Sequence, residues 1–368
     1  MDAFEAEARQ PQAIFARYGE LTMIATTRRV LSCAVLAAFA LPGIVGTAHG
    51  ATLDDVRAAD ELKCGINTGL AGFANTDDAG NWVGFDVDYC KALAAAVLGD
   101  ASKIQYVSLT GKNRFPALQA GEIEVLARNT TWTFSRDVDL GLTFVGVNYY
   151  DGQGFLGPKS LGVSSATELD GASVCIQTGT TTELNLADFF RTHNMAYEPV
   201  PIETNSEARA AYEADRCDVY TSDASGLAAT KATFDNPDDH MVLPEIISKE
   251  PLGPVVRQGD DQWADITRWV LNALISAEEL GVTQANVEAL AQDGGSDNPE
   301  VQRLLGSEGS MGAMLGLDAD WAARAIMAVG NYSEIFARHL GPDTRLGLER
   351  GLNALYSAGG ILYSPPFR

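Results

Sequence analysis

Basic residues are scarce in this chain of 368 residues, and that scarcity excludes a class of partner. Lysine and arginine total 26 against 49 aspartate and glutamate residues, for a formal net charge of −23. A protein this acidic repels a phosphate backbone, so we expect no nucleic-acid partner. The four histidines are scattered, and neither H-E-x-x-H nor G-x-S-x-G occurs. The sequence shows no apparatus for metal or phosphate chemistry, and we expect neither a metal nor a cofactor.

Long apolar runs are also missing. After residue 50 no segment reaches the roughly eighteen continuous apolar residues of a membrane span. The apolar stretch at 30–41 is too short to cross a bilayer, follows Arg28 and Arg29, and leads to small residues ending at Ala51. This order is typical of a secretory signal peptide. We expect a leader over residues 1–50, with the signal at about 23–50 and cleavage after Gly50.

The sequence contains no C-x-x-C, which removes the usual basis for zinc or redox chemistry. Four cysteines follow the predicted signal, and an even number in an exported protein favours disulfide bonds. Three pairings are possible, and four reduced, buried thiols are the alternative. Nearest-neighbour pairing, Cys64 with Cys90 and Cys175 with Cys217, would place one bridge in each half of the chain.

Strand and helix patterns alternate through the first half of the chain. Apolar runs predict strands at 62–67, 104–108 and 122–127, and helices at 89–98 and 115–120. Alternation of this kind predicts a mostly parallel sheet with covered faces. In such α/β sheets, ligands bind beyond the carboxyl ends of the strands.

A second α/β unit follows, with strands at 174–176 and 217–220 and helices at 183–192 and 207–215. The extended segments at 143–150 and 252–256 suit two crossings between domains. We therefore expect one lobe from residues 51–147 and 253–368, including a C-terminal extension from about 290, and a second lobe from residues 148–252.

Two further segments have structural interpretations. Residues 263–279 have the apolar spacing of an amphipathic helix, which we interpret as structural. Residues 152–157 match G-x-G-x-x-G, but Pro158 follows at once and the region has the pattern of a crossover strand. A dinucleotide site needs that motif to open a helix, so we expect no nucleotide there.

Polar loops at the predicted strand ends fit the two charged ends of a free amino acid. An α-carboxylate requires a bidentate donor such as arginine, with hydroxyl groups and amides beside it. Arg136 fits this role, helped by Asn129 and Thr131. Thr180 and Thr181, in the second unit, would add hydroxyl groups and amides. An α-ammonium requires a carboxylate, and Asp223 stands at a predicted strand end.

Each of these assignments has an ordinary structural alternative. Arg136 on a loop could be a surface salt-bridge partner. Asp223 could cap the helix that follows it, and residues 178–182 could be an ordinary helix amino-terminal cap.

Several motifs resemble those of the polar amino-acid class of periplasmic solute-binding proteins. Val83-Gly-Phe-Asp-Val-Asp88 is similar to the G-F-D-x-D signature of that class, and Gln177-Thr-Gly-Thr-Thr181 to its G-T-T loop. Arg136 and Asp223 stand where that class has its carboxylate-binding arginine and its ammonium-binding aspartate. Residues 114–122 and 126–136 are similar to the general L-amino-acid-binding component of ABC importers, and equally to the glutamate-, glutamine-, aspartate- and asparagine-binding component.

The resemblance implies an α/β, two-lobed periplasmic binding protein fold of type II, with two hinge strands and a ligand cleft between the lobes. The sequence departs from the class at several cleft positions. Leu70 stands where many relatives have a stacking aromatic residue, and Arg114, Arg128 and Gln177 replace apolar or small residues. The two extra arginines are expected to read the ligand side chain or, as the alternative, to pair with acidic residues of the protein. The expected pocket residues are Leu70, Phe73, Arg114, Arg128, Gln177, Thr178 and Thr180.

We therefore expect a periplasmic, non-enzymatic binding protein that captures L-amino acids over a broad range and delivers them to an inner-membrane ABC permease with its ATPase. One alternative is a periplasmic dehydratase of the arogenate or prephenate type. That enzyme would need an acid or base facing the cleft besides the ligand clamps, and we identify none. A sensory ectodomain is the other alternative, weakened because no membrane helix follows.

Overall fold

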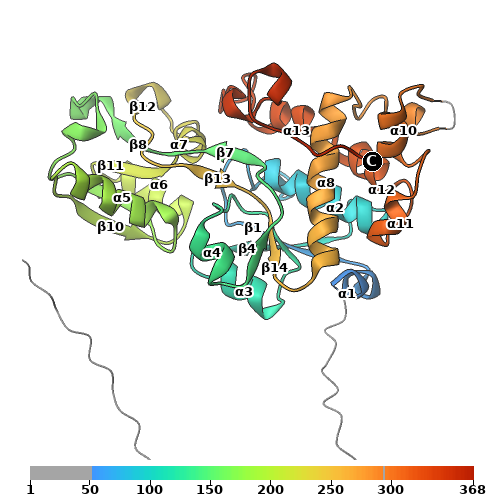
Figure 1. Cartoon of the computed structure of the whole chain (residues 1–368). Coiled ribbons are helices and arrows are strands. Elements are labelled where there is room, and N and C mark those ends of the chain that lie inside the picture. Colours follow the sequence, from blue (N-terminus) through green and yellow to red (C-terminus); the bar gives the residue numbers. More distant parts are fainter. Residues whose placement is uncertain (1–51, 293–294) are drawn as a thin grey trace, which may run out of the picture. The chain divides into compact units, whose positions relative to one another are not determined.

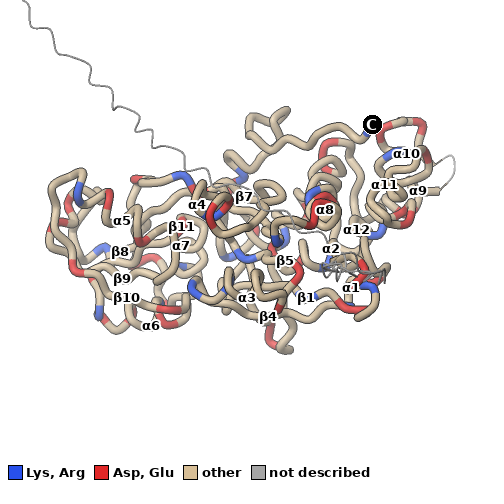
Figure 2. The backbone as a smooth tube through the Cα atoms, turned by 60° about the horizontal axis from the view of Figure 1, so that its bottom comes forward, with Lys and Arg blue, Asp and Glu red and all other residues tan. Residues whose placement is uncertain are grey.

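The computed structural model describes residues 52–292 and 295–368, and its strands form two separate five-stranded sheets (Figure 1). The predicted leader, signal peptide and cleavage position lie outside the described residues. Acidic positions occur along both the segment that carries the first sheet and the one that carries the second (Figure 2).

The first sheet has the strand order β4-β1-β5-β14-β6. Strand β1 pairs in parallel with β4 and β5, while β14 is antiparallel to both β5 and β6. The strands are β1 (Leu62–Asn67), β4 (Ile104–Leu109), β5 (Val125–Leu126), β6 (Leu142–Phe144) and β14 (Val255–Arg257). Because β14 comes from a distant part of the sequence, the chain returns to this sheet after completing the second one.

The second sheet has the order β10-β9-β11-β8-β12. Strand β9 pairs in parallel with β10 and β11, and β8 is antiparallel to β11 and β12. The strands are β8 (Gln153–Pro158), β9 (Ser173–Gln177), β10 (Glu198–Ile202), β11 (Val219–Asp223) and β12 (His240–Val242). The strand predicted over the G-x-G-x-x-G motif is confirmed, since β8 occupies it, but β8 belongs to the second sheet and is not a crossover. Only a single 3₁₀ turn, Lys159–Leu161, follows the motif.

Two short strands join the segments that carry the two sheets. Strands β7 (Tyr149–Asp151) and β13 (Glu250–Leu252) form an antiparallel pair in which Asp151 lies opposite Glu250. A further small hairpin pairs β2 (Asn75–Thr76) with β3 (Trp82–Val83).

Thirteen α-helices lie in the described part of the chain, and none of its helices has both the length and the hydropathy of a membrane span. Those before the return to the first sheet are α1 (Thr52–Ala59), α2 (Phe85–Leu98), α3 (Arg114–Ala120), α4 (Phe134–Val138), α5 (Thr181–Thr192), α6 (Asn205–Glu213) and α7 (Ala224–Lys231). Those after it are α8 (Asp261–Glu279), α9 (Val287–Ala291), α10 (Pro299–Leu305), α11 (Met311–Leu315), α12 (Trp321–Val329) and α13 (Tyr332–His339).

The G-F-D-x-D motif turns the chain from β3 into α2. Gly84 is the N-cap residue with φ 141°, and a Cβ atom there would lie 2.1 Å from the carbonyl oxygen of Phe73. Only glycine tolerates both conditions. The helix that follows carries Asp86 and Asp88 in its first turn, where carboxylates interact favourably with the helix dipole.

Each half of the described chain has its own disulfide. Cys64 bonds to Cys90, joining β1 to α2, and Cys175 of β9 bonds to Cys217, which lies just before β11. Nearest-neighbour pairing is therefore confirmed. In the chain-entropy model, each bridge stabilises the fold by about 3–4 kcal/mol.

The C-terminal helices enlarge the core of the first sheet's domain. Helix α8 buries Ile266, Val270 and Ala273, as its apolar spacing predicts, and packs against α2 and α12. The tail packs across this region, since Phe367 is 5% exposed and contacts Trp269 and Trp321.

Three predicted boundaries need correction. The strand expected at 122–127 is shortened to β5, although Glu124 and Ala127 on either side of it donate backbone hydrogen bonds to Lys63 and Gly65 of β1. Helix α2 starts earlier than predicted, since Gly84 already serves as its N-cap. The strand expected at 217–220 starts later and continues to Asp223.

Candidate functional site

A small cavity lies where loops from both sheets meet. Its volume is about 20 Å³, room for roughly one water molecule, so a larger ligand enters only if the loops or side chains rearrange. The cavity is lined by Asn67, Arg114, Arg128, Asn129, Thr131, Gln177, Thr180, Thr181, Thr182, Ser222 and Asp223. Asn67, Gln177 and Asp223 are the last residues of β1, β9 and β11, so the cavity lies beyond carboxyl ends of strands.

Three buried arginines gather at this site. Arg114, Arg128 and Arg136 are 2%, 3% and 7% exposed. In residues 52–292 and 295–368, none of their guanidinium groups has a carboxylate oxygen within 4.0 Å. The alternatives that placed them in ordinary salt bridges therefore find no support in the described part of the chain.

The protein meets these guanidinium groups with neutral acceptors. Arg128 Nε donates to the carbonyl oxygen of Leu109 at 2.7 Å, and Arg136 donates to that of Thr131 at 2.8 Å. Arg114 donates to the Thr130 hydroxyl at 3.3 Å, while its buried Nε finds no acceptor among the described residues. Buried cations without anionic partners are costly, so this arrangement favours an anionic ligand.

Neighbouring positive charges add to the effect of burial on the pKa values of Arg114 and Arg128. Burial, followed by the positive charges of Arg128 and Arg136, lowers the pKa of Arg114 well below its usual value. Burial lowers the pKa of both Arg128 and Arg136 to about 10, although Asp86 acts in the opposite direction on Arg128, as Glu250 does on Arg136. Because guanidinium is so strong a base, all three remain protonated at neutral pH.

Asp223 brings an acidic group to the same cavity. It ends β11, is 7% exposed, and makes no side-chain hydrogen bond to the start of α7. The alternative of a helix-capping aspartate is therefore not supported. Burial raises the pKa of Asp223 well above its usual range, and the nearby charges of Asp151 and Glu250 raise it further. A cationic ligand group would reverse this effect by favouring the carboxylate.

The loop threonines are already engaged by a carboxylate that the sequence did not indicate. Thr131 Oγ1 donates to Glu250 Oε2 at 2.6 Å, and Thr181 Oγ1 donates to the same oxygen at 2.9 Å. A hydroxyl group has a single proton to donate. While these bonds persist, the two hydroxyl groups offer only lone pairs to a ligand.

Most, but not all, of the site residues predicted from the sequence line this cavity. The cavity is lined by Arg114, Arg128, Asn129, Thr131, Gln177, Thr180, Thr181 and Asp223. Arg136 does not line it but donates to the carbonyl oxygen of Thr131, which does. Three others do not line it. Leu70 is a core residue, Phe73 packs edge-on against Phe85 and Tyr149, and Thr178 donates to the carbonyl oxygen of Ile202.

Asn67, Thr182, Ser222 and Glu250 are residues that sequence reasoning missed. Asn67 and Ser222 lie at or next to the end of a strand, a position that was available as a signal. The Asn67 side chain donates to Asn129 Oδ1 at 3.0 Å, and Asn129 has a positive φ of 31°. Glu250 gave no local signal because its role depends on contacts with residues more than sixty positions away.

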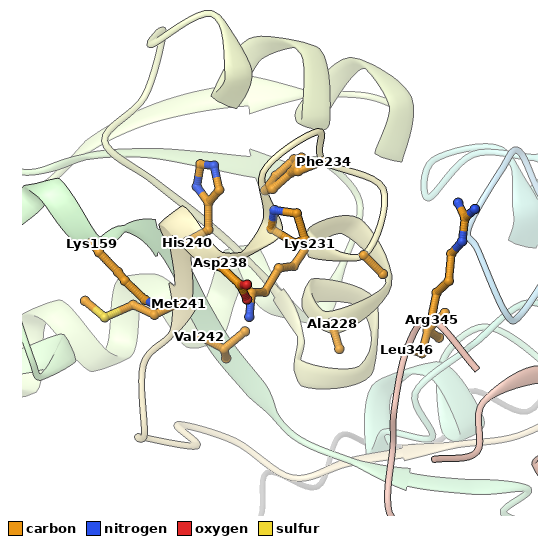
Figure 3. A pocket seen from close by; sticks show the side chains of 12 residues that line it. Lys159, Ala228, Lys231, Phe234, Asp238, His240, Met241, Val242, Arg345 and Leu346 are labelled. Carbon is orange, nitrogen blue, oxygen red and sulfur yellow. The ribbon is translucent and has the colours of Figure 1, made fainter. Parts of the chain in front are cut away.

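A larger hollow of about 810 Å³ is lined by a different set of residues (Figure 3). Arg345 and Leu346, from the C-terminal segment, contribute to it together with Lys159 and Met241. Of its Lys, Arg and Asp side chains, Lys159, Asp238 and Arg345 are exposed and Lys231 is half-buried, so water reaches all four. Burial of charge therefore identifies the smaller cavity, and not the larger hollow, as the candidate site.

The chain belongs to the bacterial extracellular solute-binding proteins, family 3, whose family model matches residues 62–285. Its fold is the two-lobed α/β fold of periplasmic binding proteins of type II, with the ligand cleft between the lobes.

Two curated relatives are similar over nearly their whole length. The glutamate/glutamine/aspartate/asparagine-binding protein BztA of Rhodobacter capsulatus is 59% identical, over 88% of this chain and 96% of that protein. The general L-amino acid-binding periplasmic protein AapJ of Rhizobium johnstonii is 56% identical, over 92% of this chain and 99% of that protein. A solved periplasmic binding protein of an ABC transporter from Brucella ovis, with glutathione bound, is 55% identical with a TM-score of 0.84, and the match covers 87% of this chain and all of that one.

Proposed function

We propose that this protein is the periplasmic substrate-binding component of an ABC importer for L-amino acids. It captures amino acids over a broad range that includes glutamate, glutamine, aspartate and asparagine. It then delivers them to an inner-membrane permease driven by an ATPase. The relatives named above support this assignment, since their names describe amino-acid binding.

The observation that carries the proposal is the complementary charge around one cavity. Buried guanidinium groups that pair with no carboxylate of the described residues provide donors for an α-carboxylate, and Asp223 provides an acceptor for an α-ammonium. We assign Arg136, Asn129, Thr131 and Thr181 to the carboxylate end. Since the Thr131 and Thr181 hydroxyl groups donate to Glu250, their contribution would come from lone pairs and backbone amides.

The three arginines at the site suggest which ligand side chains bind best. Three arginines exceed the requirement of a single α-carboxylate, and Arg114 and Arg128 both line the cavity. A ligand with two carboxylates and one ammonium would match them, as glutamate, aspartate and the γ-glutamyl tripeptide glutathione all do. Amides would bind Arg114 and Arg128 through their oxygen atoms.

The two lobes in this proposal are residues 51–147 with 253–368, and residues 148–252. Strands β7 and β13 would act as the hinge strands. Closure distinguishes the loaded from the empty protein because the ligand stabilises the closed form only through its differential affinity for that form. Export would follow from the signal peptide proposed within residues 23–50.

Native mass spectrometry of protein purified without refolding tests the proposal, because a co-purified amino acid would be identified by its mass. Isothermal titration after removal of bound ligand, with glutamate, glutamine, aspartate, asparagine, leucine and glutathione, would then rank the ligands. Incubation with prephenate and arogenate tests the dehydratase alternative. An aromatic product, or the absence of binding to every amino acid, would contradict the proposal.

A further inference from the structure

Glu250 is the most completely hydrogen-bonded carboxylate near the candidate site. It lies on β13, is 1% exposed, and accepts hydrogen bonds from four side chains. Oε2 accepts from Thr131 at 2.6 Å and Thr181 at 2.9 Å. Oε1 accepts from Ser248 at 2.6 Å and Asn185 at 2.7 Å.

The donors come from both sheets of the molecule. Thr131 follows β5 of the first sheet, and its backbone forms an isolated antiparallel bridge with Leu252. Thr181 and Asn185 lie on α5, which follows β9 of the second sheet. Ser248 stands just before β13. One carboxylate on a connecting strand therefore joins a loop of the first sheet to a helix of the second.

We propose that this set, which we call the Glu250 tie, is an inter-lobe latch that stabilises the closed arrangement of the protein. The proposal rests on the proposed function, since closure over a ligand is the step on which the tie acts. Glu250 is a positioning residue here. It does not line the cavity, so a ligand can occupy the cavity while Glu250 keeps its partners.

Geometry explains why a latch at this place is effective. A hydrogen bond to a charged group is stronger than a neutral one, and burial strengthens it further. When the lobes separate, Thr131 and Thr181 can no longer reach the same oxygen, so at least one of the two bonds is lost. The carboxylate therefore distinguishes the closed from the open form without touching the ligand.

Replacing Glu250 with glutamine tests the latch while keeping the size of the side chain. One carboxamide group cannot accept from donors on both sides, since one of its ends is itself a donor. Small-angle X-ray scattering of the ligand-free variant should give a larger radius of gyration than that of the unmodified protein. Stopped-flow binding should show faster ligand dissociation, with affinity weaker by about tenfold, as expected for losing one hydrogen bond to a charged group.

Asn185→Ala provides a second test that leaves the cavity unchanged, since Asn185 does not line it. It should change dissociation in the same direction and by a smaller factor.

Thr131→Ser keeps the hydroxyl group and should retain most of the closure that Thr131→Val loses. The matched control is Glu122→Gln, the same chemical change at an exposed glutamate, which should alter neither scattering nor dissociation.

The latch predicts similar losses for glutamate and leucine, because Glu250 acts on closure and not on the ligand side chain. Unchanged scattering with unchanged dissociation would overturn the proposal, and so would a loss confined to acidic ligands. Failure of the unmodified protein to bind any amino acid would instead contradict the proposed function. The scattering comparison of the ligand-free proteins would still decide whether the tie holds the lobes together.

Discussion

Asp88 and Asp223 are both buried aspartates, and their surroundings differ in one respect. Asp88, 4% exposed, has Lys91 at 3.0 Å and both Arg338 and His339 at 2.7 Å. Asp223, 7% exposed, has no basic side chain within 4.0 Å in the part of the chain that the structure describes. The first carboxylate is neutralised by its own protein, whereas the second is not.

The pKa values of the two carboxyl groups shift in opposite directions as a result. Burial alone would raise the pKa of Asp88, but the hydrogen bond and charge of His339, with those of Lys91 and Arg338, hold it well below its usual range. Burial and neighbouring acids hold the pKa of Asp223 well above its usual range. Burial of a charge thus marks a structural site where partners surround it, and a candidate binding site where they do not.

Neutralising Asp223 should have the largest effect on ligand binding. Asp223→Asn should weaken glutamate binding by roughly 100-fold or more, because removing one member of a buried charge pair costs about 3–5 kcal/mol. The ligand-free variant should melt at or above the temperature of the unmodified protein. Isothermal titration and thermal melts measure the two effects.

The melting prediction follows from the sign of the pKa shift. A carboxyl group whose pKa is raised by folding is favoured as the neutral acid, so ionised Asp223 costs stability as pH rises above the unfolded value of about 3.9. Asparagine never ionises and avoids that cost. A variant that bound glutamate normally, or that melted far below the unmodified protein, would show that Asp223 is a structural residue.

Asp88→Asn should produce the opposite pattern. It should lower the free energy of unfolding at pH 7 by about 2–3 kcal/mol, as expected for disrupting a buried network of ionic hydrogen bonds. Because folding lowers the pKa of Asp88, this stability is present above about pH 3.9 and is lost as pH falls through the folded pKa. Denaturant unfolding at several pH values should therefore show the gap between variant and unmodified protein closing in acid, with ligand affinity nearly unchanged.

The sequence predicts one of these two aspartates much better than the other. Asp223 comes at the end of a predicted strand, so its place at the carboxyl edge of a mostly parallel sheet could be inferred, as could the polar loops at 128–131 and 177–181. The partners of Asp88 could not be inferred, since Arg338 and His339 are some 250 residues away and reach it only through the packing of α13 beside α2. The role of Glu250 could not be inferred for the same reason. The position of Phe73 could not be inferred either, because an aromatic residue in a glycine-rich loop fits either a cleft or a core.

Arg128 lines the cavity, and its contribution should depend on the side chain of the ligand. Arg128→Met should weaken glutamate binding about tenfold more than leucine binding, since a charge-assisted hydrogen bond to a side-chain carboxylate is worth about 1.5–3 kcal/mol. Titration of the variant with both ligands measures the difference. Arg128→Lys serves as the control that keeps the charge. Equal losses for glutamate and leucine would show that Arg128 does not read the side chain.

Two ion pairs with the same spacing should contribute differently to stability, because only one of them includes a buried carboxylate. Lys91–Asp88 and Arg191–Asp188 are both ion pairs three residues apart on a helix, at 3.0 Å and 2.6 Å. In the second pair both side chains are largely exposed, 77% and 64%, so Arg191→Gln should change the free energy of unfolding by less than about 0.5 kcal/mol. Lys91→Gln should cost more, because its partner is buried and loses one of its surrounding cations. Urea unfolding of the two variants compares them directly. Equal effects would mean that the distance between two charges, and not their burial, decides how much an ion pair contributes in this protein.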